Sequence, residues 1–266
     1  MRLSVACLAV LLATGGVAEA RTPHHFVLVH GSSHGAWCWY RVKALLERGG
    51  DVVTAVDLPA HGIDRTPPER VTLDDYRDRV VQAIDAAGAP VVLVGHSMGG
   101  VTVASAAEAR PAGVAKLVYL AAYLLPNGGQ AVTVAAGDTD SALTGHLRFG
   151  DLDGDGRIDV LEFDPAIVRD AFYGLSPAAD VALAGLLLVP DPFAPIATPL
   201  RLGAAWESVR RFYIRTTKDH AVSPTAQSKM LAAVPVEKVY AIRSDHSPFF
   251  SAPEKLVKIL RAIAVR

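Results

Sequence analysis

The sequence has few cysteines and no excess of charge of either sign. It holds two cysteines in 266 residues, and 26 lysines and arginines against 27 aspartates and glutamates, for a net charge of -1. A near-neutral chain offers no electrostatic footprint for nucleic acid or for an anionic membrane surface, so we expect neither as a partner. A composition that is 51% hydrophobic and 20% charged instead favours one large globular domain with a substantial core.

Apolar runs long enough to span a membrane are also missing. The stretch LSVACLAVLLA (3–13) has eleven residues, too few to cross a bilayer. It follows a positive end at Arg2 and precedes a small-residue Ala-x-Ala pattern that ends at Ala20, an order typical of a secretory signal peptide. We expect 1–20 to be removed and a mature domain, 21–266, to be exported, either to the periplasm or as a secreted protein. That domain keeps one cysteine, which excludes an intrachain disulfide.

Apolar segments rich in valine, isoleucine and tyrosine alternate with longer helical patterns along the chain. The segments expected to be strands are 26–30, 52–57, 91–95, 116–122, 211–216 and 238–243. The segments expected to be helices are 36–49, 72–88, 98–110, 224–233 and 253–264. The strand segments are continuously apolar, which is typical of parallel strands covered on both faces. The order therefore predicts an α/β fold, a doubly wound, mostly parallel sheet of about six strands with right-handed crossovers.

Residues 126–210 interrupt this alternation. They contain no convincing parallel strand, but carry loops, an apolar helical pattern and the proline-rich VPDPFAPIATP. We interpret them as a lid inserted between the fourth and fifth strands, over the carboxyl ends of the sheet. A small independent domain is the alternative. The lid residues expected to line a pocket are Phe149, Leu186, Leu187 and Phe193.

The third expected strand runs directly into the motif Gly95-His96-Ser97-Met98-Gly99. A serine on a very tight strand-to-helix turn needs small residues two positions before and after it, and its hydroxyl then stands clear of the sheet. Gly-x-Ser-x-Gly alone occurs by chance in many chains. Here it lies at the carboxyl end of a strand and the start of a helix, which is the position a nucleophile elbow requires. Ser97 is therefore the predicted nucleophile.

A serine hydroxyl needs a base to take its proton and an acid to orient that base. In folds with such an elbow the chain order is serine, acid, histidine, and this order leaves His146, His220 and His246 as candidate bases. His246 follows the last strand, at the carboxyl edge of the sheet, and is the predicted base. Asp219 follows the preceding strand and is the predicted acid. Asp245 is its rival, but a direct neighbour of His246 has difficulty reaching the ring.

The negative charge that develops on an attacked carbonyl needs two fixed hydrogen-bond donors. The backbone amide of Met98, directly after the predicted nucleophile, is one of them. The loop after the first strand, HGSSHGAW (30–37), which we call the oxyanion loop, supplies the other, and the Ser32 amide is the predicted donor. We expect His30 and His34 to hold this loop by hydrogen bonds rather than to take part in the chemistry.

Five segments together resemble one branch of the α/β-hydrolase superfamily. They are FVLVHGSSHGAWCWYRVKALLE, VTAVDLPAHGID, LVGHSMGG, FYIRTTKDHAVSPTAQ and AIRSDHSPFFSAPEKL. The chain is similar to plant methyl esterases and hydroxynitrile lyases and to bacterial carboxylesterases, including pyrethroid-ester hydrolases. The match covers nearly the whole expected mature domain and weakens only in the lid. The resemblance places the triad of that branch on Ser97, Asp219 and His246.

The segment DLDGDGRIDVLE (151–162) fits the twelve-residue calcium-loop pattern at each main position. The other interpretation is a tight Asp-Gly turn between two short strands, LRFGD and RIDVLEF. A calcium loop of this kind needs a helix that leaves from about its tenth residue. Asp164-Pro165 instead places a helix start after the loop has ended. We favour the turn and expect no metal, with calcium as the alternative.

These residues predict a serine carboxylesterase that hydrolyses small to medium carboxylic esters through an acyl-enzyme intermediate, without a cofactor. A hydroxynitrile lyase and a non-catalytic ligand receptor on a hydrolase scaffold are the alternatives. The lyases of the resembling branch carry a lysine directly after the catalytic histidine and tend to carry a threonine in the oxyanion loop. This chain has Ser247 and Gly31 at those positions, which favours the esterase.

Overall fold

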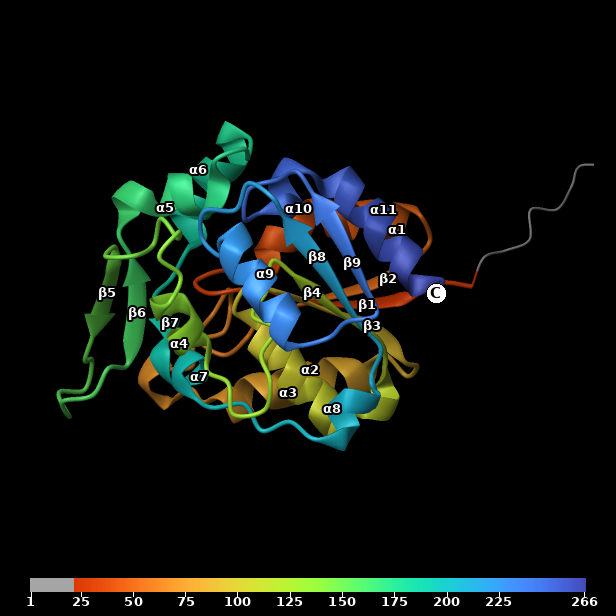
Figure 1. The fold of residues 1–266 in the computed structure, drawn as a ribbon, viewed down its shortest axis with the longest axis horizontal. Helices are drawn as coiled ribbons and strands as arrows, with labels where there is room; N and C mark the ends of the chain where they lie inside the picture. The colour runs from red at the N-terminus through yellow and green to blue at the C-terminus, as the bar shows by residue number, and fades with distance from the viewer. Residues whose placement is uncertain (1–21) are drawn as a thin grey trace, which may run out of the picture.

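Six parallel strands form the central sheet of the computed structural model, which describes residues 22–266 (Figure 1). The strands are β1 (His25–Val29), β2 (Val52–Val56), β3 (Val91–His96), β4 (Val114–Leu120), β8 (Arg211–Thr216) and β9 (Lys238–Ile242). They lie in the order β2-β1-β3-β4-β8-β9, and every neighbouring pair is parallel. The predicted doubly wound parallel sheet is confirmed. The predicted signal peptide, 1–20, lies outside the described residues.

Helices cover both faces of this sheet (Figure 1). One face carries α1 (Tyr40–Arg48), α10 (Pro248–Ser251) and α11 (Pro253–Ala264), and the other carries α2 (Leu73–Ala86), α3 (Gly99–Ala109) and α9 (Pro224–Ala233). Short 3-10 turns lie at Ala36–Trp39, Pro68–Arg70 and Pro111–Gly113. Side chains alternate along each strand, so Val27 and Val29 of β1 enter one apolar layer while Phe26 and Leu28 enter the other. None of the helices between residues 22 and 266 has the length and apolar character needed to cross a bilayer.

The strand order reverses between β1 and β3. From β1 the chain moves outward to β2 and then returns past β1 to β3. Val29 pairs with Gly95, so β1 and β3 end side by side. Doubly wound folds bind ligands at the carboxyl ends of the strands where the order reverses. The residues just after β1 and β3, among them Ser32 and Ser97, therefore start at the favoured edge.

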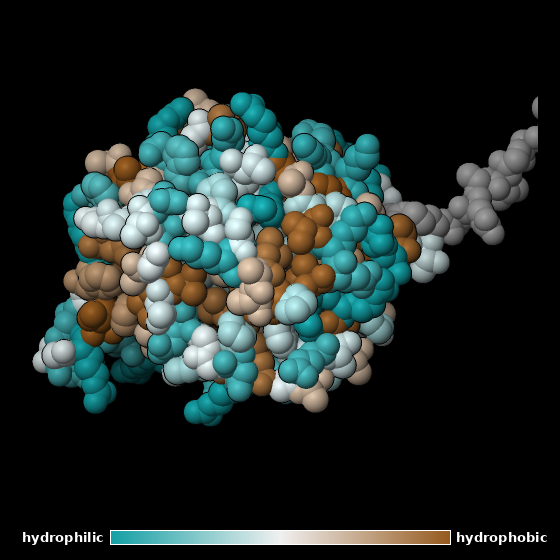
Figure 2. Space-filling model, in the orientation of Figure 1, coloured by the Kyte–Doolittle hydropathy of each residue, from teal (hydrophilic) through white to brown (hydrophobic). Residues whose placement is uncertain are grey.

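A long insertion joins β4 to β8, and most of it lies beside the sheet, while its last helix, α8 (Ala204–Ser208), lies against α3 (Figure 1). Its elements are α4 (Ala131–Ala136), β5 (Leu147–Gly150), β6 (Val160–Phe163), α5 (Pro165–Tyr173), α6 (Ala178–Leu187), β7 (Asp191–Pro192), α7 (Phe193–Ala197) and α8. β5, β6 and β7 form a separate antiparallel sheet, in which β5 and β6 are the two short strands predicted around the acidic turn. Figure 2 shows apolar side chains gathered over β5 and β6. We call residues 126–210 the lid.

Candidate active site

Ser97 occupies the tight turn between β3 and α3, with a backbone φ of +53°. This left-handed conformation is uncommon for residues other than glycine and costs about 1–3 kcal/mol. The turn is possible because glycines flank it. A Cβ atom on Gly99 would lie 2.5 Å from the carbonyl oxygen of His30, and one on Gly95 would lie 2.6 Å from Cγ2 of Val103. The local sequence thus builds the strained turn that a nucleophile elbow needs.

His246 and Asp219 meet at the carboxyl edge of the sheet, in the loops after β9 and β8. Nδ1 of His246 lies 3.0 and 2.9 Å from the two carboxylate oxygens of Asp219. The carboxylate also accepts hydrogen bonds from the Thr216 hydroxyl at 2.7 Å and from the amides of Ala221 and Val222, both at 2.9 Å. These donors fix the carboxylate, and the carboxylate in turn holds a proton on Nδ1 and orients the ring.

The other ring nitrogen of His246, Nε2, has no hydrogen-bond partner in the described part of the chain. The side chain is 1% exposed, and its ring lies beside those of His96 and Phe172, at centroid distances of 4.6 and 5.4 Å. Nε2 is not bonded to the Ser97 hydroxyl here; such bonds are often long in substrate-free enzymes and tighten when substrate binds. With Nδ1 protonated toward Asp219, Nε2 is the nitrogen free to accept a proton.

Asp245, the rival acid, binds the lid rather than the His246 ring. Its carboxylate accepts hydrogen bonds from the Leu175 amide and the Ser176 hydroxyl, both at 2.8 Å, and from the Ser247 amide at 3.1 Å. These contacts join the lid to the loop that carries His246. The structure therefore brings Asp219, and not Asp245, to the imidazole.

Two residues that line the cavity in front of the elbow serine have unpaired backbone amides. Ser32 and Met98 both line it, and neither amide donates a hydrogen bond within residues 22–266. Backbone N–H groups inside proteins are nearly always paired, so two unpaired ones beside the predicted nucleophile mark a site that can stabilise a carbonyl oxygen. Gly31 allows the two segments to meet, because a Cβ atom there would lie 2.6 Å from Cβ of Ser97.

His30 and His34 hold the oxyanion loop, as predicted. His30 Nε2 accepts a hydrogen bond from the Leu58 amide at 3.1 Å. His34 Nδ1 donates to the Ser32 carbonyl at 2.7 Å, and its Nε2 lies 2.6 Å from the Tyr173 hydroxyl. Burial lowers the pKa of His34 to about 4 and holds the pKa of His30 well below its usual range. Both rings are therefore neutral at pH 7, which matches the acceptor roles of their Nε2 atoms.

Lowering the pH from 7 to 5 is expected to destabilise the protein through His34. The unfolded side chain, with a pKa of 6.5, takes up a proton across this range, whereas the folded one, with a pKa of about 4, does not. Between these pKa values the unfolded state binds more protons, so this residue alone should lower the free energy of unfolding by about 2 kcal/mol at pH 5. Urea unfolding at both pH values measures the change. An equal pH dependence in the wild type and in His34→Gln would contradict the prediction.

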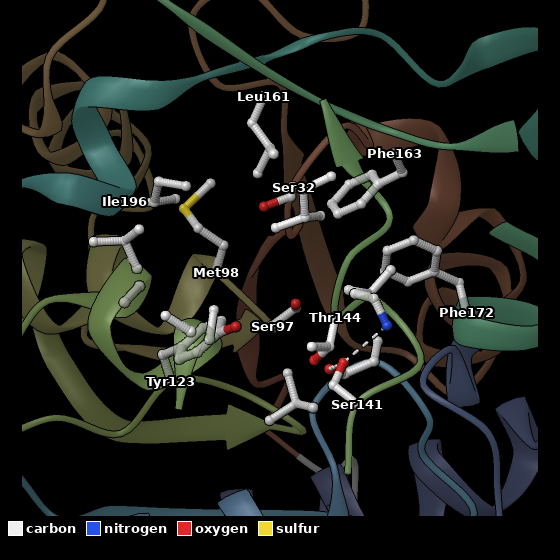
Figure 3. Close-up of a pocket in the computed structure, with 18 of the residues that line it drawn as sticks. Ser32, Ser97, Met98, Tyr123, Ser141, Thr144, Leu161, Phe163, Phe172 and Ile196 are labelled. Carbon is white, nitrogen blue, oxygen red and sulfur yellow. Dashed lines mark hydrogen bonds between the residues drawn. The ribbon is translucent and has the colours of Figure 1, made fainter. Parts of the chain in front are cut away.

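The cavity in front of Ser97 has a volume of about 200 Å³ and a mostly apolar wall (Figure 3). Its large apolar side chains from the lid are Leu143, Leu147, Phe149, Leu161, Phe163, Phe172 and Ile196. Besides Ser32 and Ser97, the polar side chains that line it are Tyr123, Ser141 and Thr144. Burial raises the pKa of Tyr123, so the phenol stays neutral. Among the residues described, no charged side chain lines this cavity, which favours an uncharged ligand.

The pocket residues predicted for the lid are only partly right. Phe149 lines the cavity, but Phe193 lies behind it, with ring centroids 5.7 Å apart. Leu186 and Leu187 do not line it either; they lie at the end of α6 and are 83% and 38% exposed. The prediction failed there because nearly every position of AADVALAGLL is apolar. Periodicity cannot tell which side of such a helix faces the core.

Residues 151–159 form the connection of the β5–β6 hairpin, outside the cavity; it is longer than the tight Asp-Gly turn predicted, because β5 ends at Gly150 and β6 begins at Val160. Asp151, Asp153 and Asp159 bring carboxylate oxygens within 4.8 Å of one another. Glu162, the last ligand that a calcium loop requires, is not part of this group; it lies on β6, opposite Arg148 of β5. The strand geometry therefore favours the turn over a calcium loop.

Chelation by EGTA is expected to leave the melting temperature and ester turnover unchanged. Carboxylates of the turn already accept hydrogen bonds from its own backbone, such as the bonds from the amides of Gly154 and Gly156 to Asp151 at 2.8 and 2.9 Å. Thermal unfolding with EGTA and with added calcium checks this. A calcium-dependent rise of several degrees that disappears in Asp153→Asn would identify the turn as a metal site instead.

Sequence reasoning missed Tyr123 and Asp191. Tyr123 follows β4 and places its side chain on the cavity wall (Figure 3). Asp191 is a fully buried lid carboxylate that contacts His61 and the amide of Ser33. It stands alone in the apolar, proline-rich segment that precedes α7. An aspartate is rarely buried without a partner. A lone aspartate in an apolar segment was therefore the sequence feature that could have indicated a paired, buried carboxylate at Asp191.

Loops after β1, β3 and β8 line this cavity, and His246, in the loop after β9, lies against Phe172 of its wall. These four loops carry a free amide after β1, the elbow serine after β3, a carboxylate after β8 and an imidazole after β9. Serine hydrolases of other folds use the same groups in other chain orders, whereas serine, acid, histidine is the order of the α/β type. The fold and the site thus have the arrangement typical of serine hydrolases built on a parallel α/β sheet.

The chain belongs to the alpha/beta hydrolase family, whose model it matches over residues 26–259. A curated relative, the putative methylesterase 11 of Arabidopsis thaliana, a chloroplastic protein, is 38% identical over 249 residues, or 91% of this chain. The chain spans 64% of the length of that relative.

Two solved structures share the fold over almost their full lengths. A methylesterase from Arabidopsis is 31% identical with a TM-score of 0.80, and the match covers 91% of this chain and 100% of that one. A pyrethroid hydrolase is 26% identical with a TM-score of 0.79, and the match covers 92% and 98%. The resemblance to methyl esterases and pyrethroid hydrolases predicted from the sequence is confirmed.

Proposed function

We propose that the protein is a serine carboxylesterase that hydrolyses uncharged esters of small to medium size. The observation that carries this proposal is the strained Ser97 turn, which opens into an apolar cavity between the unpaired amides of Ser32 and Met98. A volume of about 200 Å³ without charged groups suits an ester whose acyl or alcohol part is apolar. The methylesterase and pyrethroid hydrolase names of similar proteins support ester hydrolysis.

The first half-reaction acylates the enzyme. Ser97 Oγ attacks the ester carbonyl carbon while His246 Nε2 takes the hydroxyl proton. The carbonyl oxygen becomes an oxyanion and accepts hydrogen bonds from the Ser32 and Met98 amides. Asp219 stabilises the imidazolium through Nδ1. The carbon–oxygen bond to the alcohol then breaks, and the departing alkoxide takes the proton from Nε2.

The second half-reaction regenerates the serine. A water molecule attacks the acyl carbon of the acyl-enzyme, and His246 Nε2 accepts its proton. The same two amides hold the second oxyanion. Collapse of this intermediate returns the proton to Ser97 Oγ and releases the carboxylic acid. No step requires a cofactor.

Cyanohydrin cleavage with the same triad is the nearest alternative, and local charge argues against it. A departing cyanide needs a positive charge, which the lyases of the family supply with a lysine directly after the histidine. Here that residue is Ser247, fully buried, and no cationic side chain lines the cavity within residues 22–266. We expect the purified protein to hydrolyse p-nitrophenyl acetate and to release no cyanide from mandelonitrile. Cyanide release faster than ester hydrolysis would favour the lyase, and failure to turn over either compound would favour a receptor.

We also propose that the enzyme acts outside the cytoplasm, as the N-terminal sequence pattern predicts. N-terminal sequencing of protein recovered from the periplasm or the medium should begin at Arg21. Recovery of the intact N-terminus in a cytosolic product would refute export.

A further inference from the structure

The lid holds the oxyanion loop at Ser33, the residue after the amide donor Ser32. The Ser33 amide donates to Oδ1 of Asp191 at 3.1 Å, and the Ser33 carbonyl accepts a hydrogen bond from the Val189 amide at 3.1 Å. Both partners belong to the lid, at or just before β7. The backbone of this loop residue is therefore held by the lid on its donor side and on its acceptor side.

Ser33 needs such support because its backbone is left-handed, with a φ of +61°. A residue other than glycine keeps this conformation only where the surrounding structure holds it. The Ser33 amide and the Ser32 carbonyl belong to one peptide group, and the Ser32 amide belongs to the peptide group directly before it. A change at Ser33 therefore alters the direction of the oxyanion donor.

Asp191 is built into this position. It is fully buried, and the same Oδ1 lies 2.8 Å from Nε2 of His61, which is also fully buried. His61 comes from the loop after β2, and its Nδ1 lies 3.3 Å from the Tyr76 hydroxyl of α2. A buried carboxylate is costly unless it is paired or hydrogen-bonded. One carboxylate oxygen thus joins the lid, the oxyanion loop and the core.

We propose that Asp191 is a positioning residue for the oxyanion hole, which is complete only while the lid is docked. Asp191 does not line the cavity, so it acts through Ser33 on the Ser32 amide. The inference rests on the proposed esterase function. Oxyanion donors act on the transition state more than on the bound substrate. Loss of Asp191 therefore lowers kcat and leaves KM nearly unchanged.

The test compares two buried lid carboxylates. Asp191→Ala is expected to lower kcat for p-nitrophenyl acetate by about 10- to 100-fold with little change in KM. Asp191→Asn keeps an oxygen that can accept from Ser33 and should retain most of the activity. Asp180→Ala is the matched control, because Asp180 is 1% exposed and bonds Tyr40 and Arg41 instead of the oxyanion loop. It should change stability while kcat stays within about threefold of the wild type.

Inhibition by a trifluoromethyl ketone is a second measurement of the oxyanion hole, because the serine adds to the ketone to form a hemiketal oxyanion. The inhibition constant of the ketone should rise in Asp191→Ala by the same factor by which kcat/KM falls. Should Asp191→Ala fail to fold, the double variant Asp191→Leu/His61→Leu removes both buried partners and serves in its place. Replacing both partners of a buried pair by apolar residues of similar size is often tolerated, whereas removing one partner alone is destabilising.

Equal losses of kcat in Asp191→Ala and Asp180→Ala would overturn the positioning role, and so would a loss confined to KM. In either case wild-type ester turnover would leave the esterase assignment standing. A wild-type protein that turns over no ester would overturn both the inference and the proposed function.

Discussion

Ser97→Ala is expected to reduce ester turnover by about 1000-fold or more while the protein stays folded. The hydroxyl supplies the oxygen that bonds to the acyl carbon, and neither the histidine nor the two amides can replace it. Alanine removes one oxygen from the turn and adds no clash, so the elbow backbone should persist. The kcat/KM for p-nitrophenyl acetate, with circular dichroism to check the fold, measures the effect.

Ser105→Ala provides the matched control for this substitution. Ser105 lies on α3, the helix that starts at the elbow, and its hydroxyl donates to the Val101 carbonyl at 3.0 Å outside the cavity. It should keep turnover within about twofold of the wild type, as is usual for positions away from a site. Near wild-type turnover by a folded Ser97→Ala protein would end the nucleophile assignment.

Asp219→Asn is expected to lower kcat by about 10³- to 10⁴-fold without unfolding the protein. The amide group that replaces the carboxylate can donate toward Nδ1 of His246, which would move the ring proton to Nε2. In that tautomer the base cannot accept the Ser97 proton. Steady-state kinetics of the variant measures the loss.

Asp245→Asn separates the two candidate acids. Asp245 holds the lid through Leu175 and Ser176 and does not contact the imidazole. Its substitution should therefore cost less than about tenfold in kcat. A larger loss for Asp245→Asn than for Asp219→Asn would mean that the acid has been assigned wrongly.

Much of the fold was predictable because its signals are local. The helix expected to start at 72 begins at Leu73, with Thr72 and Asp75 forming a capping box. Pro224 and Pro253 occupy the first positions of α9 and α11, as expected for residues that fix φ and lack an amide hydrogen. The six parallel strands were also predictable from a local signal, because each is a continuously apolar segment of the sequence.

The pairing of Asp219 with His246 was predictable for a different reason. The residues are 27 positions apart, and no local pattern joins them. They meet because β8 and β9 are neighbouring parallel strands, whose carboxyl ends share one edge of the sheet. The order of serine, acid and histidine along the chain, together with the predicted parallel sheet, was therefore enough to predict this contact.

The interior of the lid was not predictable in this way. Ser33 and Asp191 are 158 residues apart; Ser33 lies in the loop after β1 of the central sheet, whereas Asp191 belongs to β7 of the antiparallel sheet. The side of α6 that faces the core was equally hidden, because the helix is apolar almost all round. These features depend on tertiary packing, which leaves no periodic trace in the sequence.

Covalent trapping of the nucleophile tests the esterase assignment most directly. Diethyl p-nitrophenyl phosphate should transfer one diethylphosphoryl group to the protein as p-nitrophenol is released. Mass spectrometry of the peptides should place that group on Ser97, and ester turnover should fall in proportion to labelling. An unlabelled Ser97 in a protein that has lost its esterase activity, or full turnover by a protein labelled at Ser97, would contradict the assignment.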